Sequence, residues 1–170
     1  GAVPMSFAQV NTLPEPVKHN YRFLALRPGD LVAPLVVVAS AADEPDYGLD
    51  INCWSDSPSD WGKVYNFGKL PFGNPALPYS TQAPFHMGFF HESDVLYKAA
   101  PFIKRTYPLL RSYQFWSLAA LAFRSGHPYW GWRFAGISLH YLQDLSQPYH
   151  ARLAPGVSTA KLLSDSILAM

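Results

Sequence analysis

The distribution of proline and glycine divides this chain into two parts that cannot fold in the same way. The sequence has 16 prolines and 11 glycines, and most of the prolines lie at or before Pro84. Proline lacks a backbone N–H and glycine is conformationally loose, so neither supports a long helix or strand. We therefore expect residues 43–84 to be a long irregular segment, and a loop of that length in a compact domain usually serves a function. Its turn formers are Pro45, Gly48, Pro58, Gly62, Gly68, Pro71, Gly73, Pro75, Pro78 and Pro84.

The second half has the apolar spacing of helices. Residues 109–123 and 129–145 are the strongest candidates, because a break at Ser125, Gly126 and Pro128 separates them. Residues 95–107 have a weaker helical pattern that Pro101 must start or kink. Ser158 is suited to cap a last helix through Leu168. For residues 1–40 we expect only irregular structure or short helix.

We expect one all-α domain over residues 1–170, with a loop-rich part at 1–84 and a helical bundle at 85–170. The chain is 49% apolar, which suffices for one sizeable core. The apolar pattern continues to Met170, which favours a truncated chain. Residues 31–42 are too short to span a bilayer, and we find no signal peptide. The aromatic residues Trp130, Trp132 and Phe134 are expected to pack in the core.

Charge and cysteine content exclude two kinds of site. The formal net charge is +1 and no run of Lys or Arg exists, so binding of duplex nucleic acid through its phosphates is not expected. Cys53 is the single cysteine, so neither an intramolecular disulfide nor a thiolate zinc cage can form.

A histidine and an aspartate four residues apart form the most informative pair. His140 and Asp144 would project from the same face of the helix expected at 129–145. Pro148 would end that helix, and His150 could fold back towards the pair. Alone, such a pair is more often a surface ion pair or a buried hydrogen bond than a metal site, so the surrounding residues decide.

Those residues carry a resemblance to a known family. Positions 136–151 read G-I-S-L-H-Y-L-Q-D-L-S-Q-P-Y-H-A, which resembles the signature segment of bacterial zinc-dependent phospholipases C, in the family that includes P1 nuclease. The resemblance implies the fold of that family, a multi-helix bundle. It implies that His140 and Asp144 bind one zinc ion, that Asp144 also bridges to a second, and that His150 binds a further one.

The resemblance also implies two ligands upstream of the helices. One is a histidine, for which we favour His91, 49 residues before His140, over His86. The other is an aspartate in a Pro-Asp-Tyr turn, for which we favour Asp46 over Asp43. Acidic residues in such loops are otherwise usually solvated.

The function implied is that of a zinc-dependent phosphodiesterase of the phospholipase C type, with one to three zinc ions and a metal-activated water. Asp144 would position that water. Asp43 or Glu92 would act as a general base or accept a hydrogen bond from a ligating imidazole. Tyr47 would face the substrate headgroup. The expected substrate is a small-molecule or phospholipid-headgroup phosphodiester, with transient contact to a membrane surface and a secreted or periplasmic location.

Departures from the family's pattern keep three further hypotheses open. No histidine follows His150, so the family's later His-x-x-x-Glu pair is absent from this sequence, and residue 1 is Gly where the family has Trp. These departures favour a non-catalytic helical relative that keeps one structural zinc. A single-strand nuclease of the P1 type is the second hypothesis, and a buried polar network without metal is the third.

Overall fold

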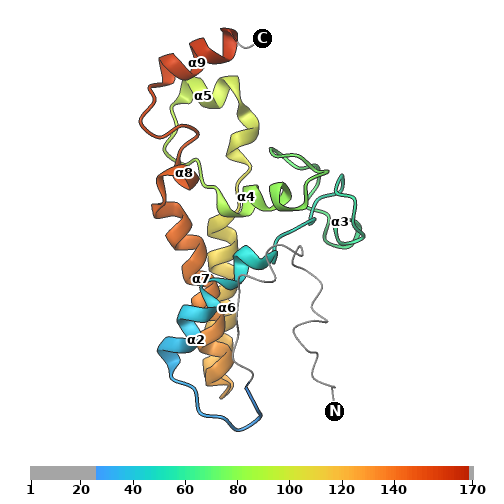
Figure 1. Ribbon diagram of the computed structural model, residues 1–170, viewed down its shortest axis with the longest axis vertical. Helices are drawn as coiled ribbons and strands as arrows, with labels where there is room; N and C mark the ends of the chain where they lie inside the picture. Colours follow the sequence, from blue (N-terminus) through green and yellow to red (C-terminus); the bar gives the residue numbers. More distant parts are fainter. Residues whose placement is uncertain (1–25, 169–170) are drawn as a thin grey trace.

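The computed structural model describes residues 26–168, and these are mostly helical with no strand (Figure 1). The all-α expectation is confirmed for this part of the chain. The expectation of irregular structure or short helix for residues 1–40 falls outside the described residues as far as residue 25. The elements in chain order are α2 Pro34–Ala41, η2 Glu44–Tyr47, α3 Trp61–Tyr65, η3 Pro78–Gln82, α4 Ala83–His86, α5 Asp94–Ala99, η4 Pro101–Lys104, α6 Pro108–Arg124, α7 Pro128–Ser146, α8 Pro148–Ala151 and α9 Thr159–Leu168.

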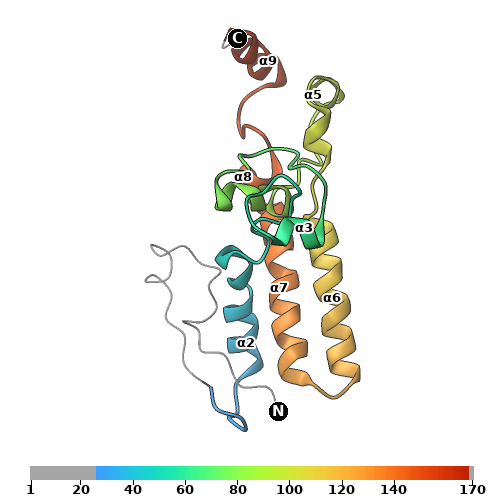
Figure 2. The ribbon, with the colours of Figure 1, turned by 90° about the vertical axis from the view of Figure 1, so that its right-hand side faces the viewer.

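Helices α6 and α7 form a hairpin that confirms the two strongest predicted helices. Each begins at a proline, where the missing N–H costs nothing because the first turn has no intrahelical acceptor for it. Gly126, with φ of +78°, makes the turn between them. On the inner faces, Ser138 donates a 2.8 Å hydrogen bond to the Ser112 carbonyl. The views of Figures 1 and 2 both show the two helices side by side.

Helix α2 packs against the other side of α7 (Figure 2). Gly136 permits this approach, because a Cβ there would lie 2.5 Å from the Val38 carbonyl oxygen and 2.8 Å from the Ala41 Cβ. The contact places the residues after α2 beside the C-terminal half of α7. The core at this interface consists of Ala41, Ile137 and Tyr141, with Phe115 and Phe134 packed against it.

A second core organises the segment that we expected to be irregular. Trp54 is fully buried, and its Nε1–H donates a 2.6 Å hydrogen bond to the Thr81 carbonyl. The segment 43–84 therefore departs from the expectation: it contains η2, α3, η3 and the start of α4, folded around one tryptophan. The core members are Cys53, Trp54 and Phe85, with Phe67, Leu70 and Tyr107 packed against them.

Proline decides the helix boundaries after His86. The predicted segment 95–107 is broken, since α5 ends at Ala99 and η4 starts at Pro101. The last predicted helix is confirmed as α9, where the Ser158 hydroxyl accepts a 3.3 Å hydrogen bond from the Lys161 N–H.

The aromatic residues at the start of α7 are less buried than predicted. Trp130 is 46% exposed and Trp132 is 38% exposed, so the expected core position is wrong for both. The described part of the chain contains no helix that is both long and apolar enough to cross a bilayer.

The thiol of Cys53 should be inert in the folded protein. Burial, followed by the negative charge of Asp50, raises the pKa of Cys53 to about 11. Because the thiolate is the reactive form, alkylation by iodoacetamide at pH 8 should be much slower in folded protein than in urea. The rate should rise as the pH approaches 11. Equal rates in folded and unfolded protein at pH 8 would show that Cys53 is accessible.

Candidate metal centre

Three separate segments bring polar side chains to one point beside the C-terminal half of α7. Asp46 lies on η2, His86 is the last residue of α4, and His140 lies on α7. Among the described residues, these three form a group whose ligand atoms all lie within 4.8 Å of one another. Asp144, one turn after His140, also contacts both imidazoles. We call these four residues the His/Asp cluster.

Asp144 joins the three histidines of this region. Its Oδ2 lies 2.9 Å from His86 Nδ1 and 3.3 Å from His140 Nε2. Its Oδ1 accepts a 2.8 Å hydrogen bond from Nδ1–H of His150, which α8 carries back towards α7 after the break at Pro148. In a neutral His150, that bond leaves Nε2 with a lone pair available for a ligand.

The tautomer of His140 is set by the backbone of the segment after α2. Its Nδ1 lies 2.7 Å from the Ala42 carbonyl oxygen. A carbonyl can only accept, so Nδ1 carries the proton and a neutral His140 turns the lone pair of Nε2 into the cluster. The His140 Nε2 lies 3.1 Å from His86 Nδ1.

Asp46 approaches the cluster from an anchored loop. Its Oδ1 lies 3.9 Å from His86 Nδ1 and 3.7 Å from His140 Nε2, and its side chain is 52% exposed. Two residues earlier, Glu44 receives a two-pronged ion pair from Arg133 of α7, with N–O distances of 2.9 to 3.1 Å. This bidentate ion pair anchors η2 to the helix that carries His140.

The charges around Asp144 favour its ionised form and the protonated forms of His140 and His150. Burial opposes ionisation of Asp144, but hydrogen bonds from His140, His150 and His86 hold its pKa far below the usual range. Burial lowers the pKa of His140, yet the hydrogen bond to Asp144 and the charges of Asp144 and Asp46 outweigh it and raise that pKa. The hydrogen bond to Asp144 is also the main reason that the pKa of His150 is raised.

The donor set fits a zinc ion. With zinc–ligand bonds of about 2.0 to 2.1 Å, tetrahedral ligand atoms lie roughly 3.3 Å apart. The separations between the two histidines, and from each histidine to each aspartate of the cluster, run from 2.9 to 3.9 Å. Two imidazoles with two carboxylates are ligands that suit zinc.

A cation would also resolve the electrostatics of the cluster. When His140 is neutral, its Nε2 and the two carboxylates direct lone pairs towards a region in which the Nδ1 of His86 can supply one proton. Electron-pair donors crowded at this distance need a shared positive charge. Either additional protons or a metal ion would supply it.

The structure brings together most, but not all, of the predicted site residues. Asp46, His140, Asp144 and His150 lie around one point. His91 does not belong to the cluster: it is exposed, and its carbonyl accepts from Arg152. Between the two histidines, the geometry favours His86 over the preferred His91.

The other predicted residues have local partners. The Asp43 carboxylate accepts a 2.6 Å hydrogen bond from the Tyr47 hydroxyl. Glu92 accepts a 2.9 Å hydrogen bond from the Leu153 N–H and lies 3.8 Å from the Arg152 guanidinium. Neither carboxylate is part of the group formed by Asp46, His86 and His140. The general-base roles of Asp43 and Glu92 and the headgroup role of Tyr47 stay predictions.

Sequence reasoning did not find the buried polar residues behind His86. Asp50, Arg111 and Tyr141 meet there, and each belongs to a different segment of the chain. No motif marks them, since Asp50 stands in a loop and the other two are spaced like ordinary helix residues. A fully buried carboxylate is recognisable only from the structure.

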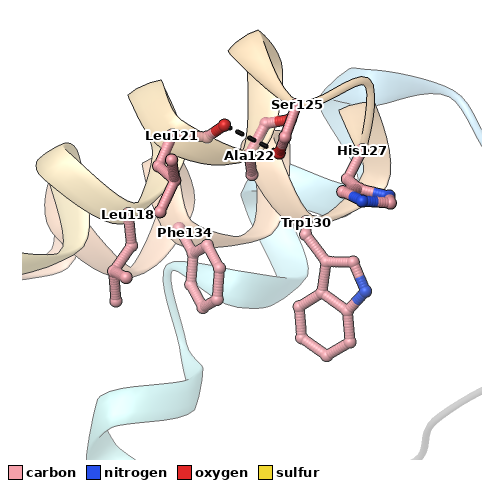
Figure 3. Close-up of a pocket in the computed structure, with 7 residues that line it drawn as sticks. All are labelled: Leu118, Leu121, Ala122, Ser125, His127, Trp130 and Phe134. Atoms are coloured by element: carbon pink, nitrogen blue, oxygen red, sulfur yellow. Dashed lines mark hydrogen bonds between the residues drawn. The ribbon is translucent and has the colours of Figure 1, made fainter.

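A shallow apolar pocket near the α6–α7 turn is separate from this cluster (Figure 3). Trp130 precedes His140 by ten residues, which is about 15 Å along a helix. The pocket therefore does not form a substrate cleft for the metal centre. Its walls are Leu118, Leu121, Ala122, Ser125, His127, Trp130 and Phe134.

No family model, curated protein or solved structure matches this chain. The function of the chain therefore has to be inferred from the side chains of the site and from their geometry.

Proposed function

We propose that this protein is a zinc-dependent phosphodiesterase of the phospholipase C and P1 nuclease type, with the helical-bundle fold of that family. The observation that carries this proposal is the convergence of Asp46, His86 and His140 from η2, α4 and α7, with ligand atoms within 4.8 Å of one another and with Asp144 in contact with both imidazoles. The signature resemblance of residues 136–151 supports the same assignment.

The chemistry follows from what these residues can hold. A bound zinc ion lowers the pKa of its water to about 7 and polarises a phosphoryl oxygen. His86 and His140 would hold the ion as neutral ligands, and Asp46 and Asp144 would neutralise its charge. The Oδ1 of Asp144 faces His150, so these two residues would start a neighbouring site, consistent with one to three ions. The substrate we propose is a small-molecule or phospholipid-headgroup phosphodiester.

The second candidate is a non-catalytic protein with one structural zinc. It is favoured by the number of candidate ligands in the cluster, because four protein ligands would leave no open position, as in structural zinc sites. The burial of His86, His140 and Asp144 agrees with this reading. Secretion and membrane-surface contact are part of the first proposal and stay predictions.

Metal analysis combined with two hydrolysis assays tests the proposal. Protein purified without chelator should contain at least one zinc ion per chain. It should hydrolyse a phosphocholine ester, and a chelator should abolish this activity until zinc is restored. Single-stranded DNA serves as the second substrate. If it is cleaved in preference to the phosphocholine ester, the protein is a nuclease of the P1 type and not a phospholipase.

The remaining outcomes are equally informative. Bound zinc without hydrolysis of either substrate would favour the structural role. Protein that neither contains zinc nor takes it up would contradict both candidates and leave a buried polar network.

A further inference from the structure

A buried charged network lies directly behind His86. The carboxylate of Asp50 is fully buried. Its Oδ2 accepts a 2.6 Å hydrogen bond from the Tyr141 hydroxyl, and its Oδ1 lies 2.5 Å from a terminal guanidinium nitrogen of Arg111. The guanidinium carbon of Arg111 lies 4.7 Å from the centre of the Phe85 ring, next to His86 in sequence.

The far nitrogen of His86 points at this network. The His86 side chain is 6% exposed, and its Nε2 lies 3.8 Å from the Oδ2 of Asp50. Nε2 has no hydrogen-bond partner among the described residues. The ring therefore presents Nδ1 to the His/Asp cluster and an unpaired Nε2 to a buried carboxylate.

Metal binding would fix which of these nitrogens carries the proton. A neutral imidazole has one N–H, and the nitrogen that ligates a cation must supply a lone pair. If Nδ1 of His86 is the ligand, its proton is lost and the remaining N–H is on Nε2. A shift of less than about 1 Å would bring that N–H within hydrogen-bond reach of Asp50, which is a small movement for a ligand ring.

We propose that Asp50 is a positioning residue of the metal centre, which accepts the Nε2–H of His86 and so holds that ring in the tautomer and orientation of an Nδ1 ligand. This inference rests on the proposed zinc site. The Ala42 carbonyl holds His140 in the same way, with Nδ1–H as the donor. Carboxylates and carbonyls behind ligating histidines are the usual partners in zinc sites.

The surroundings of Asp50 agree with this role better than with a purely stabilising one. Burying an ion pair costs desolvation energy, and the attraction between the two charges often only offsets this cost. The Asp50–Arg111 pair is therefore weak evidence for a contribution to stability. The Arg111 guanidinium contacts the Oδ1 of Asp50, and the Tyr141 hydroxyl donates a hydrogen bond to Oδ2, the oxygen that faces His86. Since an ionised carboxylate has about four acceptor positions, Oδ2 can accept from Tyr141 and His86 together.

The test compares zinc affinity and the protonation of the His86 ring in full-length variants. Asp50→Asn should bind zinc about 10 to 100 times more weakly than the wild type in competition with a chromophoric chelator. Tyr141→Phe keeps the Asp50 carboxylate, so its loss of zinc affinity should be clearly smaller. In ¹⁵N spectra of the zinc-loaded wild type, assigned by comparison with His86→Gln, His86 should be the Nε2–H tautomer, and this signal should change in Asp50→Asn.

Further measurements separate folding from positioning. Because Asp50→Asn leaves the Arg111 charge unpaired, the double variant Asp50→Asn/Arg111→Gln removes both charges and should show the same loss of zinc affinity. Zinc affinity within twofold of the wild type in either folded variant would overturn the role of Asp50. So would an Nδ1–H tautomer in the zinc-loaded wild type, which needs no variant. A wild-type protein that binds no zinc would instead overturn the proposed function.

Discussion

Replacing His86 by alanine is expected to lower the zinc affinity by more than about a hundredfold, beyond the 10- to 100-fold loss typical of residues that only support a ligand. His86 contributes a ligand atom that lies 2.9 Å from Asp144 and 3.1 Å from His140. His150, which also contacts Asp144, bonds the other carboxylate oxygen of that residue. Isothermal titration or chelator competition with zinc would measure the loss.

His91 provides the matched control for this substitution. It is an exposed histidine five residues later in the same chain segment, so His91→Ala should leave zinc affinity and stability unchanged. His140→Ala should reproduce the loss seen for His86→Ala. If His91→Ala lost zinc while His86→Ala retained it, the ligand assignment from geometry would be wrong and the preference from sequence spacing would be right.

The substitution Trp54→Ala is expected to lower the free energy of unfolding by about 3 to 5 kcal/mol, the usual cost of truncating a buried aromatic side chain to alanine. Trp54 is fully buried and contacts the rings of Phe67, Phe85 and Tyr107. Its loss would also leave the Thr81 carbonyl without the indole donor. Urea unfolding followed by far-ultraviolet circular dichroism measures this change.

Trp116 is the control for the loss of a tryptophan. It is 62% exposed on α6, so Trp116→Ala should change the free energy of unfolding by no more than about 0.5 kcal/mol. A similar cost for both variants would mean that the tryptophan-centred core does not organise the proline-rich segment. Because Phe85 belongs to that core and precedes His86, Trp54→Ala should also weaken zinc binding.

The helices of the second half were predictable because local and global signals agree there. The boundaries of α6 and α7 follow from local features: the helical spacing of apolar residues, a proline at each start and a glycine between the two helices. The pairing of His140 with Asp144 follows from helix geometry alone. The Ser158 cap of α9 is equally local.

The choice between His86 and His91 could not be made from sequence. Both follow the proline-rich segment, and the position of a loop histidine depends on how the preceding chain folds around Trp54. Asp50 was missed for a related reason, since its partner Tyr141 is 91 residues away. The outward position of Trp130 and Trp132 shows a further limit: spacing identifies an apolar stripe, but not which neighbour covers it.

The residues at the cluster are unevenly buried, so a ligand can approach it only through the more exposed residues. The side chains of His86, His140 and Asp144 are each less than one-tenth exposed, whereas Asp46 is 52% and His150 is 33% exposed. An incoming ion or phosphate ester would therefore meet the aspartate of η2 and the histidine of α8 before it reached the deeper groups. The association and dissociation rates of the ion should then depend on these two outer residues. Its binding free energy should depend mainly on His86 and His140, which lie deeper.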